Sequence, residues 1–282
     1  MAKIVFEGVR KTFGDFTALD GIDLEIQSGE FLVVVGPSGC GKSTLLDLLG
    51  GLSTPTAGRI LLDGKPVTGP GLDRGIVFQQ YALLPWRTAL GNVEFGLEAT
   101  GVPRRERTSR AREFLDLVGL TGFEDRHPHQ LSGGMRQRVA IARSLAYDPD
   151  VLLMDEPFAA LDAQTRESLQ DELRRIWQRT GKTVVFITHG IEEAVYLGQK
   201  VAVMTSRPGR IKEIVPVSFG ERPGAGPGTG NGNGLGPVSG TGPQGEELRS
   251  SPEFARYRHE IWTLLHDEVA RAQQLEKEEA SV

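Results

Sequence analysis

The feature that most constrains the fold of this chain is a glycine-rich loop placed directly after a short apolar run. The run reads "FLVVV" at 31–35, and the loop reads "GPSGCGKST" at 36–44. A continuous apolar run of this length is typical of a strand that is covered on both faces of a parallel sheet. The loop matches the pattern G-x-x-x-x-G-K-S/T, in which successive backbone amides converge on phosphate oxygens. The sequence therefore predicts a phosphate-binding loop between a buried strand and a helix.

The parts of this loop have separate chemical tasks. Its glycines let the backbone curl around phosphates, Lys42 reaches the β- and γ-phosphates, and Ser43 is left to bind Mg²⁺. We expect a nucleoside triphosphate to contact the whole segment, which consists of Gly36, Pro37, Ser38, Gly39, Cys40, Gly41, Lys42, Ser43 and Thr44. Cys40 is the only cysteine of the chain, which excludes an internal disulfide. Its thiol is either reactive, because it lies at a helix N-terminus, or packed inertly.

Two further apolar runs indicate more strands of the same sheet. They read "VLLM" at 151–154 and "TVVFIT" at 183–188, and helical patterns flank both. The first is followed by Asp155 and Glu156, at the end of a strand where a parallel sheet presents its ligands. Because successive residues of a strand face opposite sides, we assign Asp155 to Mg²⁺ and Glu156 to the water that attacks the γ-phosphate, as general base.

The N-terminal stretch has a different pattern, with apolar residues at alternate positions over 4–6 and 22–26. This alternation favours strands with one buried face in an antiparallel edge sheet. We expect these strands to be joined through turns at Gly14, Asp15 and Gly21.

A second anion-binding helix end is indicated by "LSGGMRQRVAIARSLA" at 131–146. A glycine pair follows a serine there and opens an amphipathic helix whose first amides face outward. One nucleotide does not obviously need two separate helix ends to hold its phosphates. The sequence therefore raises the question of what the second end binds.

The order of the motifs makes the chain resemble the ATPase subunit of an ABC transporter, over about residues 3–216. Besides the phosphate loop, "IVFQQ" resembles the Q-loop, "LSGGMRQR" the family signature and "LLMDEP" the Walker B strand. "ALD" at 160–162 resembles the D-loop, and "ITH" contains the switch histidine, His189. The resemblance implies an α/β P-loop NTPase fold of the ABC cassette type. Such a fold has a mixed sheet core, an antiparallel β edge sheet and a helical signature subdomain.

The architecture of that family implies what the second helix end binds. Its ATPases form head-to-tail dimers in which each ATP lies between the phosphate loop of one copy and the signature of the other. In this chain Ser132, Gly133 and Gly134 would bind the nucleotide of a second copy, and hydrolysis would let the two copies separate. Asp162 of the D-loop would cross the same interface.

The resemblance also implies the remaining site roles. Gln79 would contact Mg²⁺ and the attacking water while its loop touches a membrane subunit, and His189 would hold the γ-phosphate. Phe13 lies where the family stacks an aromatic ring on adenine, although a lone Phe at a strand end is otherwise usually a core residue. The residue after the switch histidine is Gly190, where many relatives carry an acid. A hydrogen bond from that acid across the interface is therefore not expected here.

Composition divides the chain after the cassette. We expect the cassette to span 1–216, with its helical subdomain at about 88–148. Glycine and proline dominate 217–250, which predicts a flexible linker. Residues 251–282 predict an amphipathic helix that either docks back on the core or contacts a partner subunit. Ser251 would cap this helix, Pro252 would begin it, and its apolar stripe consists of Phe254, Tyr257, Ile261, Leu264, Leu265 and Val269.

Several phrases, among them "YALLPWRT" at 81–88, resemble the ATPases of bacterial importers for nitrate, aliphatic sulfonates and taurine. Such importers combine two ATPase copies, two membrane-spanning permease subunits and an extracytoplasmic solute-binding protein. The resemblance thus implies a peripheral ATPase at the cytoplasmic face of the inner membrane, with ATP and Mg²⁺ as ligands. Tyr81, Leu83, Leu84 and Trp86 would form an apolar groove for a permease helix, or some of them would belong to the core.

The chain offers no other route to a membrane or to nucleic acid. It has no apolar run of the roughly 18 to 20 residues that a bilayer span needs, and its start lacks the apolar centre of a signal peptide. We therefore expect a soluble, intracellular protein or one held at a membrane by other subunits. Its 32 Lys and Arg residues against 37 Asp and Glu residues give no electrostatic reason to expect nucleic acid as a partner.

Three alternative functions are less consistent with the motifs. ABC ATPases of translation normally carry two cassettes, and those of DNA repair insert a long coiled coil between the phosphate loop and the signature. Only about ninety residues separate Lys42 from Ser132 here, without sustained heptads. A P-loop kinase would not explain the signature or His189. Exporter cassettes are commonly fused to membrane spans, and the "EEA" after the switch histidine is more typical of importers.

Overall fold

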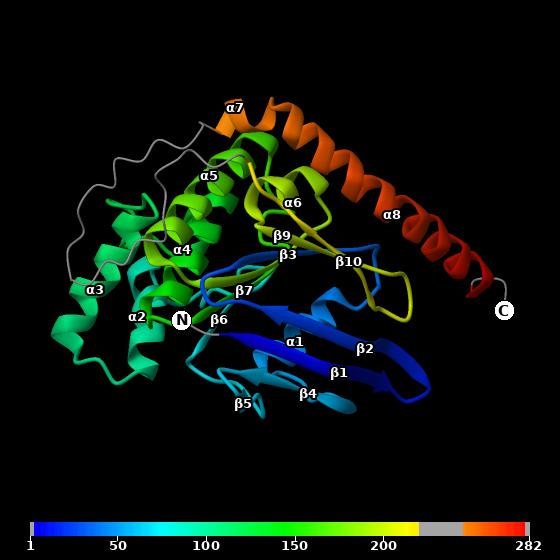
Figure 1. The fold of residues 1–282 in the computed structure, drawn as a ribbon. Helices are drawn as coiled ribbons and strands as arrows, with labels where there is room; N and C mark the ends of the chain where they lie inside the picture. Colours follow the sequence, from blue (N-terminus) through cyan, green and yellow to red (C-terminus); the bar gives the residue numbers. More distant parts are fainter. Residues whose placement is uncertain (1–2, 220–244, 280–282) are drawn as a thin grey trace.

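A six-stranded sheet forms the centre of the fold, with its strands in the order β10-β9-β3-β8-β7-β6. The computed structural model describes residues 3–219 and 245–279, and in it a second sheet of four antiparallel strands has the order β2-β1-β4-β5 (Figure 1). The strands are β1 (Ile4–Phe13), β2 (Phe16–Ile26), β3 (Phe31–Val35), β4 (Ala57–Leu62), β5 (Lys65–Pro66), β6 (Arg74–Val77), β7 (Val151–Asp155), β8 (Thr183–Ile187), β9 (Lys200–Met204) and β10 (Ile211–Pro216). The helices are α1 (Lys42–Gly50), α2 (Ala89–Ala99), α3 (Arg104–Leu117), α4 (Gly133–Ala146), α5 (Ala163–Thr180), α6 (Ile191–Leu197), α7 (Gly245–Arg249) and α8 (Pro252–Glu279), with a short 3-10 helix at Pro128–Gln130.

Strand β3 lies inside this sheet and is buried on both faces. Phe31, Val33 and Val35 belong to one apolar core, and Leu32 and Val34 belong to another. Its neighbours β8 and β9 both run parallel to it. A continuous apolar run is what such a position requires, because every side chain leaves water. The predicted central strand of a covered parallel sheet is therefore confirmed.

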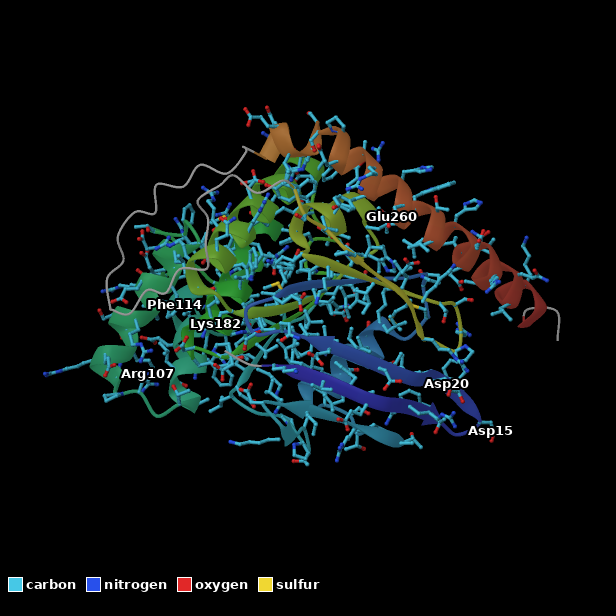
Figure 2. All side chains as sticks on the ribbon, in the orientation of Figure 1. Asp15, Asp20, Arg107, Phe114, Lys182 and Glu260 are labelled. Atoms are coloured by element: carbon cyan, nitrogen blue, oxygen red, sulfur yellow. The ribbon has the colours of Figure 1, made fainter. Side chains whose placement is uncertain are left out.

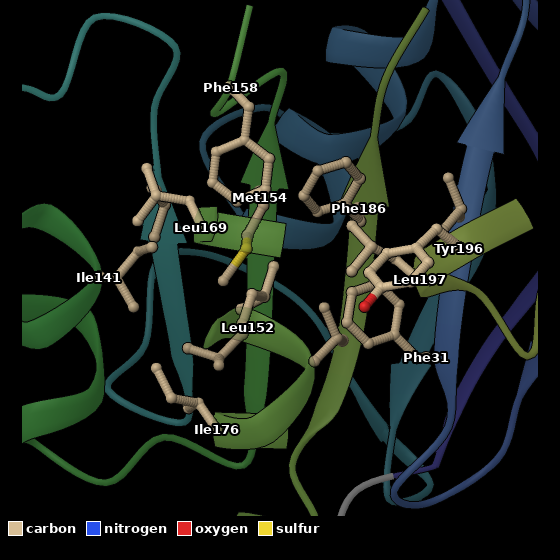
Figure 3. Close-up of a cluster of buried hydrophobic side chains, with 14 of the residues drawn as sticks. Phe31, Ile141, Leu152, Met154, Phe158, Leu169, Ile176, Phe186, Tyr196 and Leu197 are labelled. Carbon is tan, nitrogen blue, oxygen red and sulfur yellow. The ribbon is translucent and has the colours of Figure 1, made fainter. Parts of the chain in front are cut away.

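The core on the helical side of the sheet lies under α4, α5, α6 and α8. Figure 3 shows Leu152 and Met154 of β7 between Ile141 of α4 and the aromatic side chains nearer to β8. Two of these rings, Phe158 and Phe186, lie with their centroids 5.7 Å apart in a tilted arrangement. This packing fixes the strand ends that carry the candidate site.

The core on the other side holds α1 between the two sheets, as Figure 1 also shows. The β1–β2 hairpin turns at Gly14 and Asp15, as predicted. The prediction of a turn at Gly21 is wrong, because Gly21 lies inside β2. Its φ of 68° and the irregular register beside it, between the pairs Val9–Ile22 and Lys11–Leu19, mark a bulge that glycine accommodates without strain.

Helices α2, α3 and α4 pack on one another at one end of the molecule, and α4 contacts the sheet at its edge strand β6 (Figure 1). They lie within the range of 88–148 expected for the helical part. Figure 2 shows Arg107 and Phe114 on α3, at the opposite end of the view from Asp15 and Asp20. Arg107 pairs with Glu98 of α2 at 2.8 Å, so the arginine-rich helix is partly tied to its neighbour.

The C-terminal helix α8 docks back on the cassette, where it contacts α6 and β9. Phe254 and Ile261 are buried there, as the predicted stripe requires. The prediction for Val269 is wrong, because its side chain is 39% exposed and Glu268 is buried instead. Most of the predicted linker lies outside the described residues, and its last part forms α7.

Glu268 is buried because its carboxylate has three partners on the β9–β10 side. It accepts hydrogen bonds from the amide and the hydroxyl of Ser206, at 2.9 and 3.1 Å, and Lys212 lies 2.9 Å away. Burial opposes ionisation, but the Ser206 amide and Lys212 together hold the pKa of Glu268 below its ordinary value. A carboxyl whose pKa is lowered by folding stabilises the folded form above its unfolded pKa, and this contribution is lost as the pH falls through the lower folded value.

We therefore expect Glu268→Gln to loosen the docking of α8 at neutral pH, because the ion pair with Lys212 is lost. Limited trypsin digestion should cut α8 about tenfold faster in this variant, while the rest of the chain stays resistant. Glu260→Gln is the matched control, since Glu260 lies on the outward face of the same helix (Figure 2). Equal digestion of both variants would show that Glu268 does not hold the helix.

Candidate active site

The carboxyl ends of the adjacent parallel strands β3, β8, β7 and β6 lie side by side, from the interior of the sheet to its edge. Ile187 of β8 pairs with Val34 of β3 on one side and with Asp155 of β7 on the other. On the far side of β7, Val77 of β6 pairs with Met154. Parallel strands in register present the residues that follow them along one edge. The segments that follow these four strands contain the phosphate loop, Glu156, His189 and Gln79.

The phosphate loop turns sharply from β3 into α1. Gly41 is the N-cap of α1 with a φ of 99°, a left-handed conformation that glycine adopts without a steric penalty. A Cβ on Gly36 would approach the Sγ of Cys40 to 2.7 Å, so the loop is close-packed at its first residue. Lys42 is buried, and its Nζ donates to the carbonyl oxygens of Gly36 and Pro37 at 3.0 and 2.9 Å. The loop thus combines the free amides of a helix start with an ammonium group.

Cys40 is a covered thiol inside this loop. Burial raises the pKa of the Cys40 thiol, against the opposing effect of the Lys42 ammonium 3.9 Å away. A protonated, covered thiol is a poor nucleophile, so the structure favours inert packing over reactivity.

We expect Cys40 to react with Ellman's reagent far more slowly in the folded protein than in urea-unfolded protein. MgATP should not change the slow rate, because the thiol is already covered without it. Absorbance of the released thiolate at a fixed reagent concentration provides the measurement. Rapid labelling that MgATP suppresses would contradict this prediction and favour a reactive thiol.

Glu156 and His189 meet at the ends of β7 and β8. Nε2 of His189 lies 2.5 Å from Oε1 of Glu156, a distance at which an imidazole N–H donates to a carboxylate. The backbone of Glu156 has a φ of 44°, unusual for a residue with a side chain, and its amide donates to the carbonyl of Ile187 at 3.0 Å. Such conformations persist where the surroundings enforce them, and they cluster at functional sites.

Asp155 precedes this pair and has an unsatisfied oxygen. Its Oδ1 is buried and makes no hydrogen bond with any of the described residues. Burial, reinforced by the charge of Asp155, raises the pKa of Asp47 in α1. A buried carboxylate oxygen without a donor, close to a second acid, is an environment that a cation stabilises.

Gln79 is exposed in the segment after β6, and α4 fixes that segment from the side. Arg143 donates to the carbonyl oxygens of Tyr81 and Ala82, at 3.1 and 2.6 Å. Both of these residues have positive φ, 59° and 46°. Sequence patterns gave no sign of Arg143, because helical periodicity reports apolar faces and not which polar side chain reaches a neighbouring loop.

Some of the apolar residues of "YALLPWRT" pack against the core, and others are exposed as a permease contact would require. Tyr81 and Leu83 pack partly against the core, whereas Trp86 is 71% exposed. The backbone of Leu84 is held by the buried side chain of Asn92, which accepts from its amide at 2.8 Å and donates to its carbonyl at 3.1 Å. Tryptophan is among the residue types enriched at the centres of protein interfaces. Asn92 was not among the residues predicted from the sequence, although a polar residue within an apolar helical stretch is a usable signal.

The signature begins α4 in surroundings separate from those of the phosphate loop. Oγ of Ser132 accepts from the amide of Met135 at 3.2 Å and caps the helix. A Cβ on Gly134 would approach the side chain of Thr165 in α5 to 2.6 Å. The close neighbours of the Gly133 position are Leu161 and Tyr81, and those of Gly36, Gly39 and Gly41 include Met204, Arg207 and Leu19. The two helix starts therefore do not share a close neighbour within one chain.

Asp162 and Phe13 both lie at the surface. Asp162 caps α5, and the hydrogen bonds from Thr165, whose amide is 2.9 Å from Oδ1, lower the pKa of Asp162. Phe13 ends β1 with its ring 53% exposed, and Nζ of Lys11 lies 4.9 Å from the ring centroid. Phe13 is therefore not a core residue, and its ring is available for stacking.

These features define a class of protein. A phosphate loop between a central strand and a helix, an acid pair on the next-but-one strand and a histidine on the strand between are the features of a P-loop nucleoside triphosphatase. The antiparallel sheet and the helical layer that begins with a serine-glycine-glycine turn add the cassette architecture expected from the sequence.

The particular family follows from comparison with known proteins. A family model described as "ABC transporter" matches residues 19–159. The chain belongs to this family and is the ATP-binding subunit of an ABC transporter, an ATPase.

Two relatives and one solved structure illustrate the similarity. The nitrate import ATP-binding protein NrtD of Synechocystis is 49% identical over 261 residues, which cover 93% of this chain and 91% of that protein. The taurine import ATP-binding protein TauB of Pseudomonas putida is 56% identical over 208 residues, covering 74% of this chain and 79% of that protein. A dimeric ATP-binding cassette in a post-hydrolysis state, bound to ADP and Pi, superposes with a TM-score of 0.68 at 36% identity. It covers 77% of this chain and 99% of its own.

Within residues 3–219 and 245–279, no helix has both the length and the apolar character that crossing a bilayer requires.

Proposed function

We propose that this ATPase energises the import of a small anionic solute of the nitrate, taurine or aliphatic sulfonate kind. The similarity to NrtD and TauB carries the proposal, since both proteins are named for import and NrtD matches 93% of this chain. It favours import over the alternatives of export, translation and DNA repair. The solute itself is not recognised by this subunit in the proposed assembly, so its identity depends on the partner proteins.

The proposed assembly contains two copies of this chain, two membrane-spanning permease subunits and an extracytoplasmic solute-binding protein. The chain would lie at the cytoplasmic face of the inner membrane. Trp86 supports a permease contact, because it is exposed on a loop whose backbone is held by Arg143 and Asn92. Arg143 and Asn92 would transmit a shift of the loop to α4 and α2, the helices to which they belong.

Each ATP would lie between two copies of the chain. The phosphate loop, from Gly36 to Thr44, would hold it in one copy, with Phe13 stacked on the adenine. Ser132, Gly133 and Gly134 would supply amides and a hydroxyl from the other copy, and Asp162 would cross the same interface. The separate surroundings of the two helix starts support this arrangement, as does the dimeric state of the similar cassette bound to ADP and Pi.

Hydrolysis would use the pair at the ends of β7 and β8. Glu156 would take a proton from a water molecule as its oxygen attacks the γ-phosphorus, and the bond to the β-phosphate oxygen would break. Lys42 and His189 would stabilise the charge on the γ-phosphate oxygens. The products would be ADP and inorganic phosphate, and their separation would remove the link between the two copies.

Mg²⁺ is the metal that fits this site. The unpaired, buried Oδ1 of Asp155 supplies a hard oxygen ligand, and the hydroxyl of Ser43 and the amide oxygen of Gln79 would complete the protein's share. No group of three or more His, Cys, Asp or Glu side chains in the described parts of the chain is arranged to hold a metal. When bound, Mg²⁺ would neutralise part of the phosphate charge.

Reconstitution tests the proposal. The chain should co-purify with a pair of permease subunits and, in liposomes with the binding protein, hydrolyse ATP faster when taurine or nitrate is present outside. A neutral sugar provides the control solute. Stimulation by the sugar and by neither anion would contradict the proposed solute class, and outward transport would contradict import.

A further inference from the structure

The C-terminal segment reaches the switch histidine through a chain of side-chain hydrogen bonds. Nη2 of Arg249, in α7, donates to Oε1 of Gln170 in α5 at 2.9 Å. Nε2 of Gln170 donates to Oε1 of Glu193 in α6, also at 2.9 Å. Oε2 of Glu193 accepts from the hydroxyl of Thr188, and the oxygen of that hydroxyl accepts from the amide of Gly190 at 3.0 Å. We call this set of five residues the tail relay.

The middle of the tail relay is buried along one side of a cavity. Gln170, Glu193 and Thr188 are all buried. Burial raises the pKa of Glu193, and the hydrogen bonds from Thr188 and Gln170 oppose that effect. Buried polar groups of this kind are costly to leave without partners, so removing one member perturbs the others.

The outer end of the relay is fixed as firmly as its middle. The guanidinium of Arg249 stacks on the ring of Tyr196 in α6, 3.8 Å from the centroid, and lies 3.7 Å from Asp171. The hydroxyl of Tyr196 donates to the same carboxylate. Arg249 therefore has one defined position, and α7 is joined to α5 and α6 through it.

The inner end of the relay surrounds the switch residue. Thr188 and Gly190 are the two neighbours of His189, and the relay ties the side chain of one to the backbone of the other. His189 in turn meets Glu156 at 2.5 Å. The catalytic pair and Arg249 line the same cavity of about 960 Å³. Gln170, Glu193 and Thr188 of the relay line this cavity as well.

We infer that Arg249 and Gln170 are positioning residues for His189, so that the C-terminal segment sets the rate of ATP hydrolysis. This inference rests on the roles proposed for His189 and Glu156. It assigns a task to α7, which none of the sequence motifs covers. Because the relay holds the backbone of the switch and not the phosphate loop, it acts on the rate of hydrolysis and not on nucleotide affinity.

Steady-state kinetics of the full chain test the inference. Arg249→Ala should lower kcat for MgATP about threefold to tenfold, the effect of losing one hydrogen bond of ordinary net strength, with KM within about twofold of the wild type. Arg249→Lys should recover part of the loss, since an ammonium can still donate to Gln170. Arg258→Ala is the matched control. Arg258 lines the same cavity and pairs with Glu192 at 3.0 Å, outside the relay.

A double-mutant cycle then distinguishes the relay from two unrelated defects. Gln170→Ala should lower kcat by a similar factor, and the double variant should be no slower than the slower single variant, because both changes break the same chain. Independent, multiplying effects would overturn the inference, as would a normal kcat in Arg249→Ala. All variants should stay folded at the assay temperature, as checked by thermal melting, and equal binding of a fluorescent ATP analogue should accompany the loss. A fall in analogue binding that accounts for the loss would also overturn it.

His189→Ala separates this inference from the proposed function. If His189→Ala hydrolyses ATP at the normal rate, the role proposed for the switch histidine fails, and the inference fails with it. If His189→Ala is inactive while Arg249→Ala and Gln170→Ala are normal, the proposed function stands and only the positioning role is wrong.

Discussion

Replacing Glu156 by glutamine should abolish steady-state ATP hydrolysis and leave MgATP binding intact. The amide keeps the size of the side chain and can still meet His189, but it cannot take a proton from water. Loss of a general base lowers the rate by about 10²–10⁴-fold. The phosphate loop and the signature are unchanged in this variant, so the uncleaved nucleotide should hold two copies together. Light scattering during gel filtration should therefore show a dimer with MgATP and a monomer without it.

Glu167→Gln is the control for this experiment, because Glu167 lines the same cavity from α5 and is exposed there. It should hydrolyse ATP at the normal rate. Normal hydrolysis by Glu156→Gln would rule out Glu156 as the base. An inactive variant that stays monomeric with saturating MgATP would keep the base but contradict the clamp between two copies.

Replacing Ser132 by arginine should stop hydrolysis without weakening nucleotide binding by the isolated chain. The arginine would occupy the space at the start of α4 where the γ-phosphate of the other copy is proposed to lie. Hydrolysis should fall by at least about 10²-fold, the loss seen when a donor to a developing charge is removed. A filter assay with labelled ATP at a concentration that keeps the chain monomeric should give wild-type affinity.

Thr88→Arg is matched to this change. Thr88 caps α2 in the same way as Ser132 caps α4, by accepting from an amide three residues ahead at 3.1 Å. Both variants lose a cap worth about 1 kcal/mol, so their stabilities should be similar. Thr88→Arg should still hydrolyse ATP in the isolated protein. If Ser132→Arg instead lost its affinity for ATP as a monomer, the signature would serve the nucleotide of its own chain.

The elements that carry the phosphate loop could be predicted because their signals are local. A strand that is covered on both faces must be apolar at every position, and Gly41 must adopt a φ that other residues avoid. Each of these requirements can be recognised in a short run of adjacent residues. The acid pair and His189 follow apolar runs of the same kind. Their mutual position then follows from the register of β3, β8 and β7.

The contacts that could not be predicted join residues far apart in the chain. Arg249 and Gln170 are 79 positions apart, and Gln170 and Glu193 are 23 apart. Polar pairs of this kind have no period, and an arginine on a short helix looks the same whether it meets water or a buried glutamine. The error at Val269 has the same origin. Val269 was placed in the apolar stripe on helical spacing alone. Glu268 faces inward instead because its carboxylate binds Ser206, which follows β9, and Lys212 of β10.

The burial of Cys40 has a practical consequence for watching this ATPase at work. Since the only native sulfhydryl is covered, a cysteine introduced at an exposed position such as Gln273 would be the one thiol that reacts rapidly with a label. A dye attached there would lie on α8, close to the point where Ala272 and Leu275 of that helix line a small pocket with Ser38 of the phosphate loop. Its emission could then be followed in real time through successive turnovers, with no need to remove the natural residue.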